Sequence, residues 1–273
     1  MQAKFKPMPI GVDNFKELIE KNYYFVDKTR FIRELIDGQS KVTLITRPRR
    51  FGKTLTLSML KYFFDIAKAE ENRALFNGLN IERVGDRYMA EQGSRPVVFF
   101  SLKDIKTASY EDMMEGMGEV LRDLCGEFRY LLTSDKIAED EKQFLQRIID
   151  KTANRFEMQM VIKNLTTYLS RHHHRRVLLL IDEYDAPIQC AWEYGYYDEA
   201  IIFLRNFFSA ALKTNPALDF AVMTGVLRIS KESIFSALNN LMVSSVLHGR
   251  YPVVMGFTRE EITQMALFHL ETH

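Results

Sequence analysis

The fold is decided by the stretch VTLITRPRRFGKT, residues 42–54. Its first part, Val42–Thr46, is apolar and β-branched, which predicts a buried strand. A Gly-Lys-Thr tripeptide closes the stretch, and apolar residues at helical spacing follow from Leu55. Strand, turn, lysine, hydroxyl and helix N-terminus together form the layout of a loop that binds phosphates. A nucleoside triphosphate is therefore the first ligand to consider.

The residues of this loop have distinct roles in the prediction. Gly52 lets the backbone approach the ligand, Lys53 reaches the β- and γ-phosphates, and Thr54 places its hydroxyl on Mg²⁺. The usual pattern has glycine where Arg47 stands, so a surface turn with a solvated lysine stays open as the alternative. The predicted nucleotide-binding set is Arg50, Phe51, Gly52, Lys53, Thr54 and Leu55.

Three arginines, Arg47, Arg49 and Arg50, make the loop basic, and Pro48 stiffens its turn. Their side chains could contact phosphates, a nucleic-acid backbone or the acids of a partner. Three neighbouring arginines are too small a patch to predict nucleic-acid binding by themselves. The pattern leaves these alternatives open.

A second motif lies far downstream. Val177–Ile181 is a continuous apolar run, typical of a strand buried on both faces, and Asp182 and Glu183 follow it. An apolar strand that ends in Asp-Glu is the Walker B arrangement. In it, Asp182 would hold Mg²⁺ through water, and Glu183 would orient and polarise the attacking water. A solvated acidic loop is the alternative. A bound cation is favoured, because two acids at a strand end would repel each other without one.

A third candidate is the strand end Met223-Thr224-Gly225. In P-loop ATPases with a catalytic glutamate, the strand between the two Walker strands often ends in a polar residue that senses the γ-phosphate. We predict this role for Thr224, with Arg228 supplying positive charge to the transition state. The alternatives are a hydroxyl that caps the next turn and an arginine in a loop salt bridge.

Strands alternate with helices along the chain, which predicts an α/β fold with a mostly parallel sheet and helices on both sides. The domain prediction is a helical extension at 1–40, a core at 41–257 and the start of a truncated helical lid at 258–273. Thr258 and Glu261 predict a capping box for the last helix. Further apolar runs predict strands at Val97–Leu102, Leu218–Gly225 and Tyr251–Met255.

Composition excludes several classes of protein. The formal net charge is +1, which favours neither nucleic acid nor a membrane surface as an obligatory partner. The two cysteines are too few for a disulfide framework or a zinc site. No signal peptide and no apolar run of membrane-spanning length is present, so we predict a cytoplasmic location.

Two further clusters are interpreted as structural. His172-His173-His174-Arg175-Arg176 is interpreted as a solvated basic turn before a strand. Metal binding is the alternative, and it is disfavoured because adjacent histidines on a helix point in different directions. The aromatic residues after Asp185 favour core packing or an interface over a ligand cage. They are Trp192, Tyr194, Tyr196, Tyr197, Phe203, Phe207 and Phe208.

With these motifs placed, the chain resembles the AAA-ATPase-like domain family, whose members often carry a C-terminal PD-(D/E)XK nuclease-type domain. The resemblance covers nearly the whole chain. It implies a three-layer P-loop ATPase core of about five strands in the order 5-1-4-3-2, with the N-terminal segment packed near the nucleotide. It also makes Arg47 a family trait. The motifs that carry it are IGVDNF at 10–15, YFVDKT at 24–29, TRPRRFGKT at 46–54, LIDEYD at 180–185 and TGVLRISKESIF at 224–235.

Three functional hypotheses follow. The first is an ATP-binding and ATP-hydrolysing switch for a C-terminal effector domain absent from this chain, with ATP and Mg²⁺ as ligands. The second is a nucleotide-gated interaction module with negligible hydrolysis. The third is the ATPase part of a nucleic-acid-processing protein, which rests on family association alone. Base preference and oligomeric state stay open.

Overall fold

The computed structural model describes residues 6–227, 234–235, 241–245 and 254–272. The chain divides into two compact units. Unit 1 comprises residues 1–39, 47–94 and 244–273, and unit 2 comprises residues 40–46 and 95–243. The phosphate-loop sequence therefore belongs to unit 1, whereas the strand that leads into it belongs to unit 2. The domain boundaries predicted at residues 40 and 257 stay a prediction.

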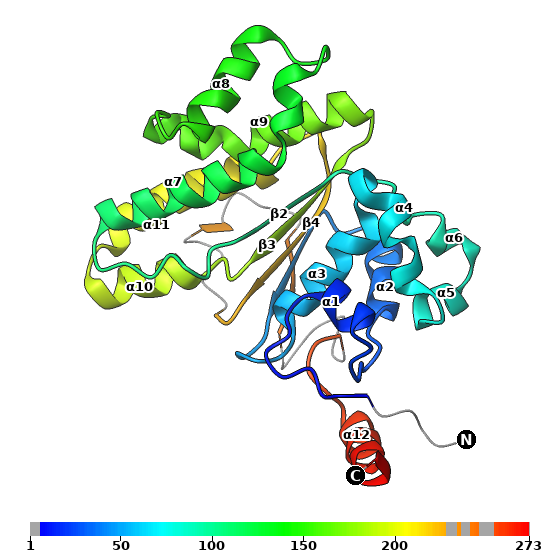
Figure 1. The fold of residues 1–273 in the computed structure, drawn as a ribbon. Helices are drawn as coiled ribbons and strands as arrows, with labels where there is room; N and C mark the ends of the chain where they lie inside the picture. Colours follow the sequence, from blue (N-terminus) through cyan, green and yellow to red (C-terminus); the bar gives the residue numbers. More distant parts are fainter. Residues whose placement is uncertain (1–5, 228–233, 236–240, 246–253, 273) are drawn as a thin grey trace. The chain divides into compact units, whose positions relative to one another are not determined.

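Unit 2 is built around a sheet that has five strands in the described residues, in the order β2-β3-β4-β1-β5 (Figure 1). The order 5-1-4-3-2 implied by the resemblance is this same order counted from the opposite edge. The pairings of β1 with β4, β4 with β3 and β3 with β2 are all parallel. The predicted α/β class is thus confirmed. The strands are β1 Val42–Thr46, β2 Val97–Ser101, β3 Val177–Asp182, β4 Leu218–Gly225 and β5 Leu241–Ser244.

The burial of the strands follows from their composition. Every residue of β1 and of β3 is buried, as the continuous apolar runs predict for strands covered on both faces. The strand predicted at Tyr251–Met255 falls mostly outside the described part, since residues 251–253 are not described, and its last two residues lie in a bend. Strand β5 lies earlier in the chain, at Leu241–Ser244. The apolar core of β5, Leu241-Met242-Val243, is short and is flanked by asparagines and serines. The sequence of β5 therefore resembles that of a loop.

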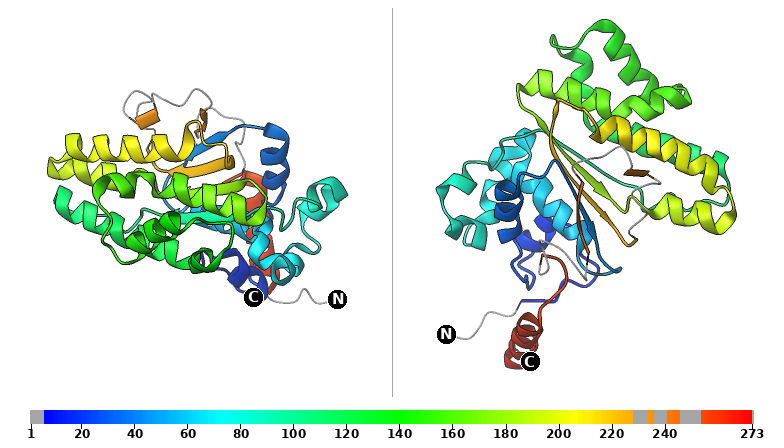
Figure 2. Two further views of the ribbon diagram at one scale, coloured as in Figure 1. Left: turned by 90° about the horizontal axis from the view of Figure 1, so that it is seen from above. Right: turned by 180° about the vertical axis from the view of Figure 1, so that it is seen from behind.

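Long helices pack on this sheet. Helix α7 contacts β2, α9 contacts β3, and α11 lies side by side with α9 (Figures 1 and 2). Helices α8 and α9 are separated by a short break in which Lys151 adopts a positive φ of 58°. Among the described residues, no helix is both long and apolar enough to cross a membrane. The helices of unit 2 are α7 Tyr110–Glu127, α8 Glu139–Ile149, α9 Arg155–His173, α10 Ala186–Tyr194 and α11 Tyr197–Leu212, with a 3-10 turn η3 at Arg129–Thr133.

The predicted solvated turn before a strand covers only part of the histidine run, because His174, Arg175 and Arg176 are exposed ahead of β3. His172 and His173 are the last residues of α9, and they pack against Tyr130 with ring centroids 5.1 and 5.9 Å away. The Tyr130 hydroxyl lies 2.8 Å from His173 Nε2, and His172 Nδ1 lies 2.8 Å from the Ser134 hydroxyl. The two side chains therefore anchor the helix end to the preceding segment, and the exposed turn begins at His174.

Unit 1 collects short helices around an aromatic cluster. The α1 backbone is held to α3 by the Phe15 amide, which donates to Ser58 Oγ at 2.9 Å. The Phe15 and Phe63 rings each lie 5.0 Å from the ring of buried Phe76. The helices are α1 Phe15–Glu20, α2 Arg30–Gly38, α3 Lys53–Phe64, α4 Ala69–Asn72, α5 Asn80–Val84, α6 Asp86–Met89 and α12 Arg259–Thr272, with 3-10 turns η1 Ile66–Lys68 and η2 Arg73–Phe76.

Helix α12 begins with the predicted capping box. The Thr258 amide donates to Glu261 Oε2, and the Glu261 amide donates to Thr258 Oγ1. Glu261 also pairs with Lys28 at 2.6 Å, which ties the helix to the N-terminal segment. Phe268 of α12 packs on Tyr24, with the ring centroids 4.7 Å apart. This contact covers part of the apolar side of the helix.

Candidate functional site

The predicted phosphate loop, residues 47–54, leads into a helix as the sequence pattern indicates. Gly52 lies in the left-handed region with a φ of 75°, and α3 begins at the next residue. The Gly52 carbonyl accepts hydrogen bonds from the Thr56 amide and the Thr56 hydroxyl, both at 2.9 Å. Arg50 also has a positive φ, 67°, which is uncommon for a residue with a side chain. The loop therefore presents the N-terminus of a twelve-residue helix, where the helix dipole favours an anion.

Lys53 is folded back over this loop. It is 5% exposed, and its Nζ donates to the carbonyls of Arg47 at 3.2 Å and Pro48 at 3.1 Å. These two carbonyl oxygens compensate for the burial of the ammonium group. The same Nζ is held at the loop whose helix N-terminus favours anions, so a phosphate oxygen could replace the carbonyls as its partner.

Arg47 has a role that the sequence left open. It is 2% exposed, and its Nη1 donates to the Ser244 carbonyl at 2.9 Å while its Nη2 donates to Ser244 Oγ at 3.3 Å. Burial lowers the pKa of Arg47 from its ordinary value. The guanidinium therefore fastens the start of the loop to the last residue of β5, whereas Arg49 and Arg50 are exposed.

The middle of the loop is fastened in a second place. The Gly256 amide donates to the Phe51 carbonyl at 2.9 Å. A side chain at Gly256 would place its Cβ 2.7 Å from the Phe51 ring, and Gly256 has a φ of 81°. Only glycine fits this close approach at this backbone conformation without strain. Two residues of the C-terminal segment, Ser244 and Gly256, thus hold the phosphate loop.

The acidic motif gathers with the third strand end in unit 2. Asp182 and Thr224 are both 0% exposed, and the Thr224 hydroxyl donates to Asp182 Oδ1. The register places Thr224 beside Ile45 of β1, because β4 lies between β1 and β3 in the sheet. Ligands of parallel α/β sheets bind at the carboxyl ends of the strands, where Asp182, Glu183 and Thr224 stand.

Glu183 has a strained backbone. Its φ is 48°, and it is partly exposed between the buried residues Asp182 and Tyr184. A non-glycine residue in this region costs about 1 to 3 kcal/mol, and such residues cluster at active sites. The Tyr184 amide donates to the Thr224 carbonyl at 3.1 Å, so the turn is tied to β4 directly after Glu183. The glutamate is thereby held at the strand end while its neighbours stay in the core.

Asp185 is a member of this site that the motif reading did not assign. It is 1% exposed, and its Oδ2 accepts hydrogen bonds from the amides of Val226 at 3.0 Å and Leu227 at 2.6 Å. The same oxygen accepts from Gln189 Nε2 at 2.7 Å. Asp185 therefore links the turn that carries Glu183 to the segment that follows Thr224. The acidic string Asp-Glu-Tyr-Asp was a usable signal, because its last acid lies only three residues after the end of an apolar strand.

The two residues predicted to hold magnesium, one in each unit, carry oxygen donors of a suitable kind. Mg²⁺ prefers hard oxygen ligands, and a buried carboxylate at Asp182 and a partly buried hydroxyl at Thr54 are of that kind. Within the described residues, no group of three or more His, Cys, Asp or Glu forms a ready metal cage. Mg²⁺ needs no such cage when phosphate oxygens and waters complete its shell. Arg228, the remaining predicted site residue, lies outside the described residues.

Comparison with known proteins agrees with this geometry. The family model described as Predicted AAA-ATPase matches residues 9–235. The chain is 32% identical over 259 residues to a protein of Azotobacter chroococcum mcd 1, described as an uncharacterized protein in the vnfD 5' region. That alignment covers 94% of this chain and 44% of the relative, so the chain spans less than half of the relative's length. No solved structure matches the chain.

Proposed function

We propose, from the premise that this chain belongs to the predicted AAA-ATPase family, that it binds Mg²⁺-ATP and hydrolyses it to ADP and phosphate. The observation that carries the proposal is the strand-end group of Asp182, Glu183 and Thr224. A buried carboxylate held by a buried hydroxyl stands next to a strained, partly exposed glutamate. Packing alone gives no reason to strain an acid at the end of a fully buried strand.

Each residue has a defined task in this proposal. Lys53 leaves the Arg47 and Pro48 carbonyls and binds the β- and γ-phosphates, while the backbone from Arg50 to Leu55 surrounds them. Thr54 and Asp182 hold Mg²⁺, which neutralises charge on the phosphate oxygens when it is bound. Lys53 belongs to unit 1 and Asp182 to unit 2.

The chemical step needs an oriented water. Glu183 accepts a proton from that water as it attacks the γ-phosphate, and its fixed backbone limits where the carboxylate can reach. Thr224 reports the γ-phosphate through its bond to Asp182, and Arg228 supplies positive charge to the transition state. The wider switch role, and control of a further effector domain, are part of the proposal and rest on the family.

Two measurements test it. Calorimetric titration with ATP in the presence and absence of Mg²⁺ should show tighter binding with the ion, and the gain should vanish in Asp182→Asn. Lys53→Ala should weaken ATP binding at least about tenfold, since it removes charge-assisted hydrogen bonds to phosphate. Arg49→Ala, an exposed change in the same loop, is the control. Equal ATP affinity in wild type, Lys53→Ala and Asp182→Asn would refute the proposal.

A second candidate is the nucleotide-gated interaction module that hydrolyses ATP negligibly. The contacts of Lys53 favour it, because the ammonium group already has two carbonyl partners within the loop. A nucleotide must displace these two carbonyls from Lys53. The loop then has two states, one with Lys53 bound to the carbonyls and one with Lys53 bound to phosphate, and nucleotide binding could switch between them. Multiple-turnover phosphate release at saturating ATP separates the candidates, because a gate binds without turnover.

A further inference from the structure

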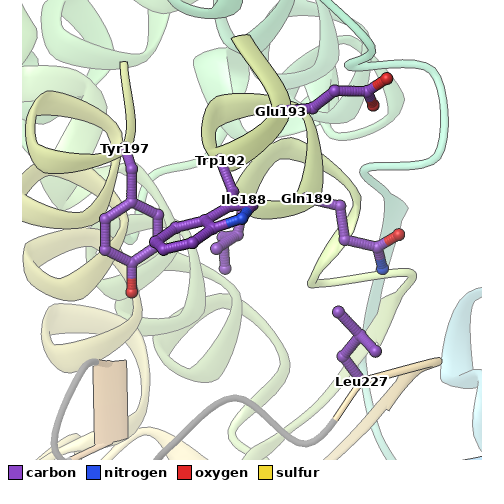
Figure 3. A pocket seen from close by; sticks show the side chains of 6 residues that line it. All are labelled: Ile188, Gln189, Trp192, Glu193, Tyr197 and Leu227. Atoms are coloured by element: carbon purple, nitrogen blue, oxygen red, sulfur yellow. The ribbon is translucent and has the colours of Figure 1, made fainter. Parts of the chain in front are cut away.

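A pocket of about 530 Å³ lies on unit 2, and none of the residues that line it has a task in the proposed nucleotide chemistry. Helix α10 supplies most of its wall, and the start of α11 and the segment after β4 complete it. Figure 3 shows Trp192 and Tyr197 on one side of it and Gln189 and Leu227 on the other, with the Glu193 carboxylate at its edge, directed away from Trp192 in this view. The size is within the usual range of ligand pockets. The residues that line it are Ile188, Gln189, Trp192, Glu193, Tyr197 and Leu227.

The aromatic wall is unusually open. Trp192 is 75% exposed, and its only ring neighbour in the described residues is Tyr197, at a centroid distance of 5.5 Å and an interplanar angle of 89°. Leu227 is 48% exposed beside it. By contrast, Phe203 and Phe207 are fully buried, so the aromatic run divides into a core half and a surface half. An exposed tryptophan at a pocket is typical of a binding surface rather than of packing.

The charged residues of α10 and of α11 up to Leu204 are acidic. Between Ala186 and Leu204 the sequence contains three acids and no lysine, arginine or histidine. These acids, Glu193, Asp198 and Glu199, are exposed, and Glu193 lines the pocket itself. An indole face attracts a cation through its quadrupole, more strongly than other aromatic rings do. Indole and carboxylate together therefore select a positively charged group.

The pocket is also preorganised. Gln189 Nε2 and the Leu227 amide both donate to Asp185, and the Tyr184 hydroxyl donates to the Leu227 carbonyl at 2.8 Å. Two wall residues are thus fixed by a common buried carboxylate. Because the Gln189 amide nitrogen bonds Asp185, its amide oxygen is the atom able to accept from a ligand. A preorganised wall lowers the entropy that a ligand must lose on binding.

We propose that this pocket binds an arginine side chain presented by a peptide segment of a partner protein. The planar guanidinium stacks on the Trp192 indole and donates to the Glu193 carboxylate, while its aliphatic stem packs on Ile188 and Leu227. Arginine suits this site better than lysine, since its flat group stacks and donates at the same time. The binding requires neither nucleotide nor hydrolysis, so it stands apart from the proposed ATPase activity.

The test uses the fact that Trp192 is the one tryptophan of the chain, so its fluorescence reports on the pocket alone. The full chain is titrated with two short peptides, which carry arginine or its neutral isostere citrulline between two leucines. We expect a saturable change with the arginine peptide and affinity about 3- to 30-fold weaker with citrulline. Glu193→Gln should remove most of that difference, whereas Glu139→Gln on α8 should leave it unchanged.

The same arginine peptide, labelled with fluorescein and followed by anisotropy, tests Trp192 itself. Trp192→Ala should weaken binding about 3- to 30-fold, and Tyr194→Ala should not. Tyr194 is the matched control because it is an exposed aromatic on the same helix that does not line the pocket. Three results would each overturn the proposal. The first is equal affinity for the two peptides, and the second is an equal loss of peptide affinity in Trp192→Ala and Tyr194→Ala. The third is that no peptide binds while the chain self-associates in a way that Trp192→Ala abolishes.

Discussion

Removing the carboxylate of Asp185 should loosen the link between the Glu183 turn and the segment after Thr224. In Asp185→Ala the amides of Val226 and Leu227 lose their shared acceptor. An unsatisfied buried donor costs about 1 to 3 kcal/mol, which gives about 2 to 6 kcal/mol for the two. Leu227 is 48% exposed and water can reach its amide in part, so we expect about 2 to 3 kcal/mol. Asp185→Asn keeps an acceptor without the charge and should lose about 1 kcal/mol.

Urea unfolding followed by circular dichroism measures these losses, and hydrogen exchange locates them. The exchange of the Val226 and Leu227 amides should accelerate by about 30-fold or more in Asp185→Ala, since each 1.4 kcal/mol is a factor of ten. Asp150→Ala is the control, because Asp150 also accepts from a glutamine four residues away but is exposed. If Asp185→Ala and Asp150→Ala lose the same small amount of stability, the reasoning about Asp185 is refuted.

Three further predictions concern the rest of the chain. Arg47→Ala should cost about 2 kcal/mol or more in urea unfolding, because two hydrogen bonds from a charged donor are lost, while exposed Arg49→Ala should change stability by less than about 0.5 kcal/mol. Burial raises the pKa of Cys125 to about 12, so at pH 8 a thiol reagent should label Cys190 and leave Cys125 unmodified, as mass spectrometry would show. Burial lowers the pKa of His173 below its ordinary 6.5. The neutral imidazole therefore contributes its full stabilisation above pH 6.5, and this contribution falls as the pH drops below 6.5. In unfolding titrations, His173→Gln should reduce the dependence of the unfolding free energy on pH in that range.

Local patterns were enough to predict the fold class and the central strands. The runs Val42–Thr46 and Val177–Ile181 are apolar because both faces of β1 and β3 are covered. The burial of these strands can therefore be predicted from their composition. The capping box at Thr258 and Glu261 is equally local. The short helices α4 to α6 and strand β5 have no comparable periodic pattern, since a single turn or a three-residue apolar core gives too few repeats.

The partners of the site residues could not be predicted in this way. Arg47 and Ser244 are 197 residues apart in the chain, and nothing near either one indicates the other. The acceptor role of Asp185 depends on two backbone amides 41 and 42 residues downstream, which no side-chain pattern reports. Sequence motifs predict which side chains take part in the chemistry. The groups that orient those side chains come from distant parts of the chain and are known only from the tertiary structure.

The most direct test of the central claim is phosphate release at saturating Mg²⁺-ATP by wild type and Glu183→Gln, with ATP affinity measured in parallel. Glutamine keeps the shape of the side chain but cannot take a proton from water. We predict unchanged ATP affinity and a fall in turnover of about 100-fold or more, the typical contribution of a general base. Turnover by Glu183→Gln equal to that of a wild type that hydrolyses ATP would contradict the role of Glu183, and a wild type that neither binds nor hydrolyses ATP would contradict the account as a whole.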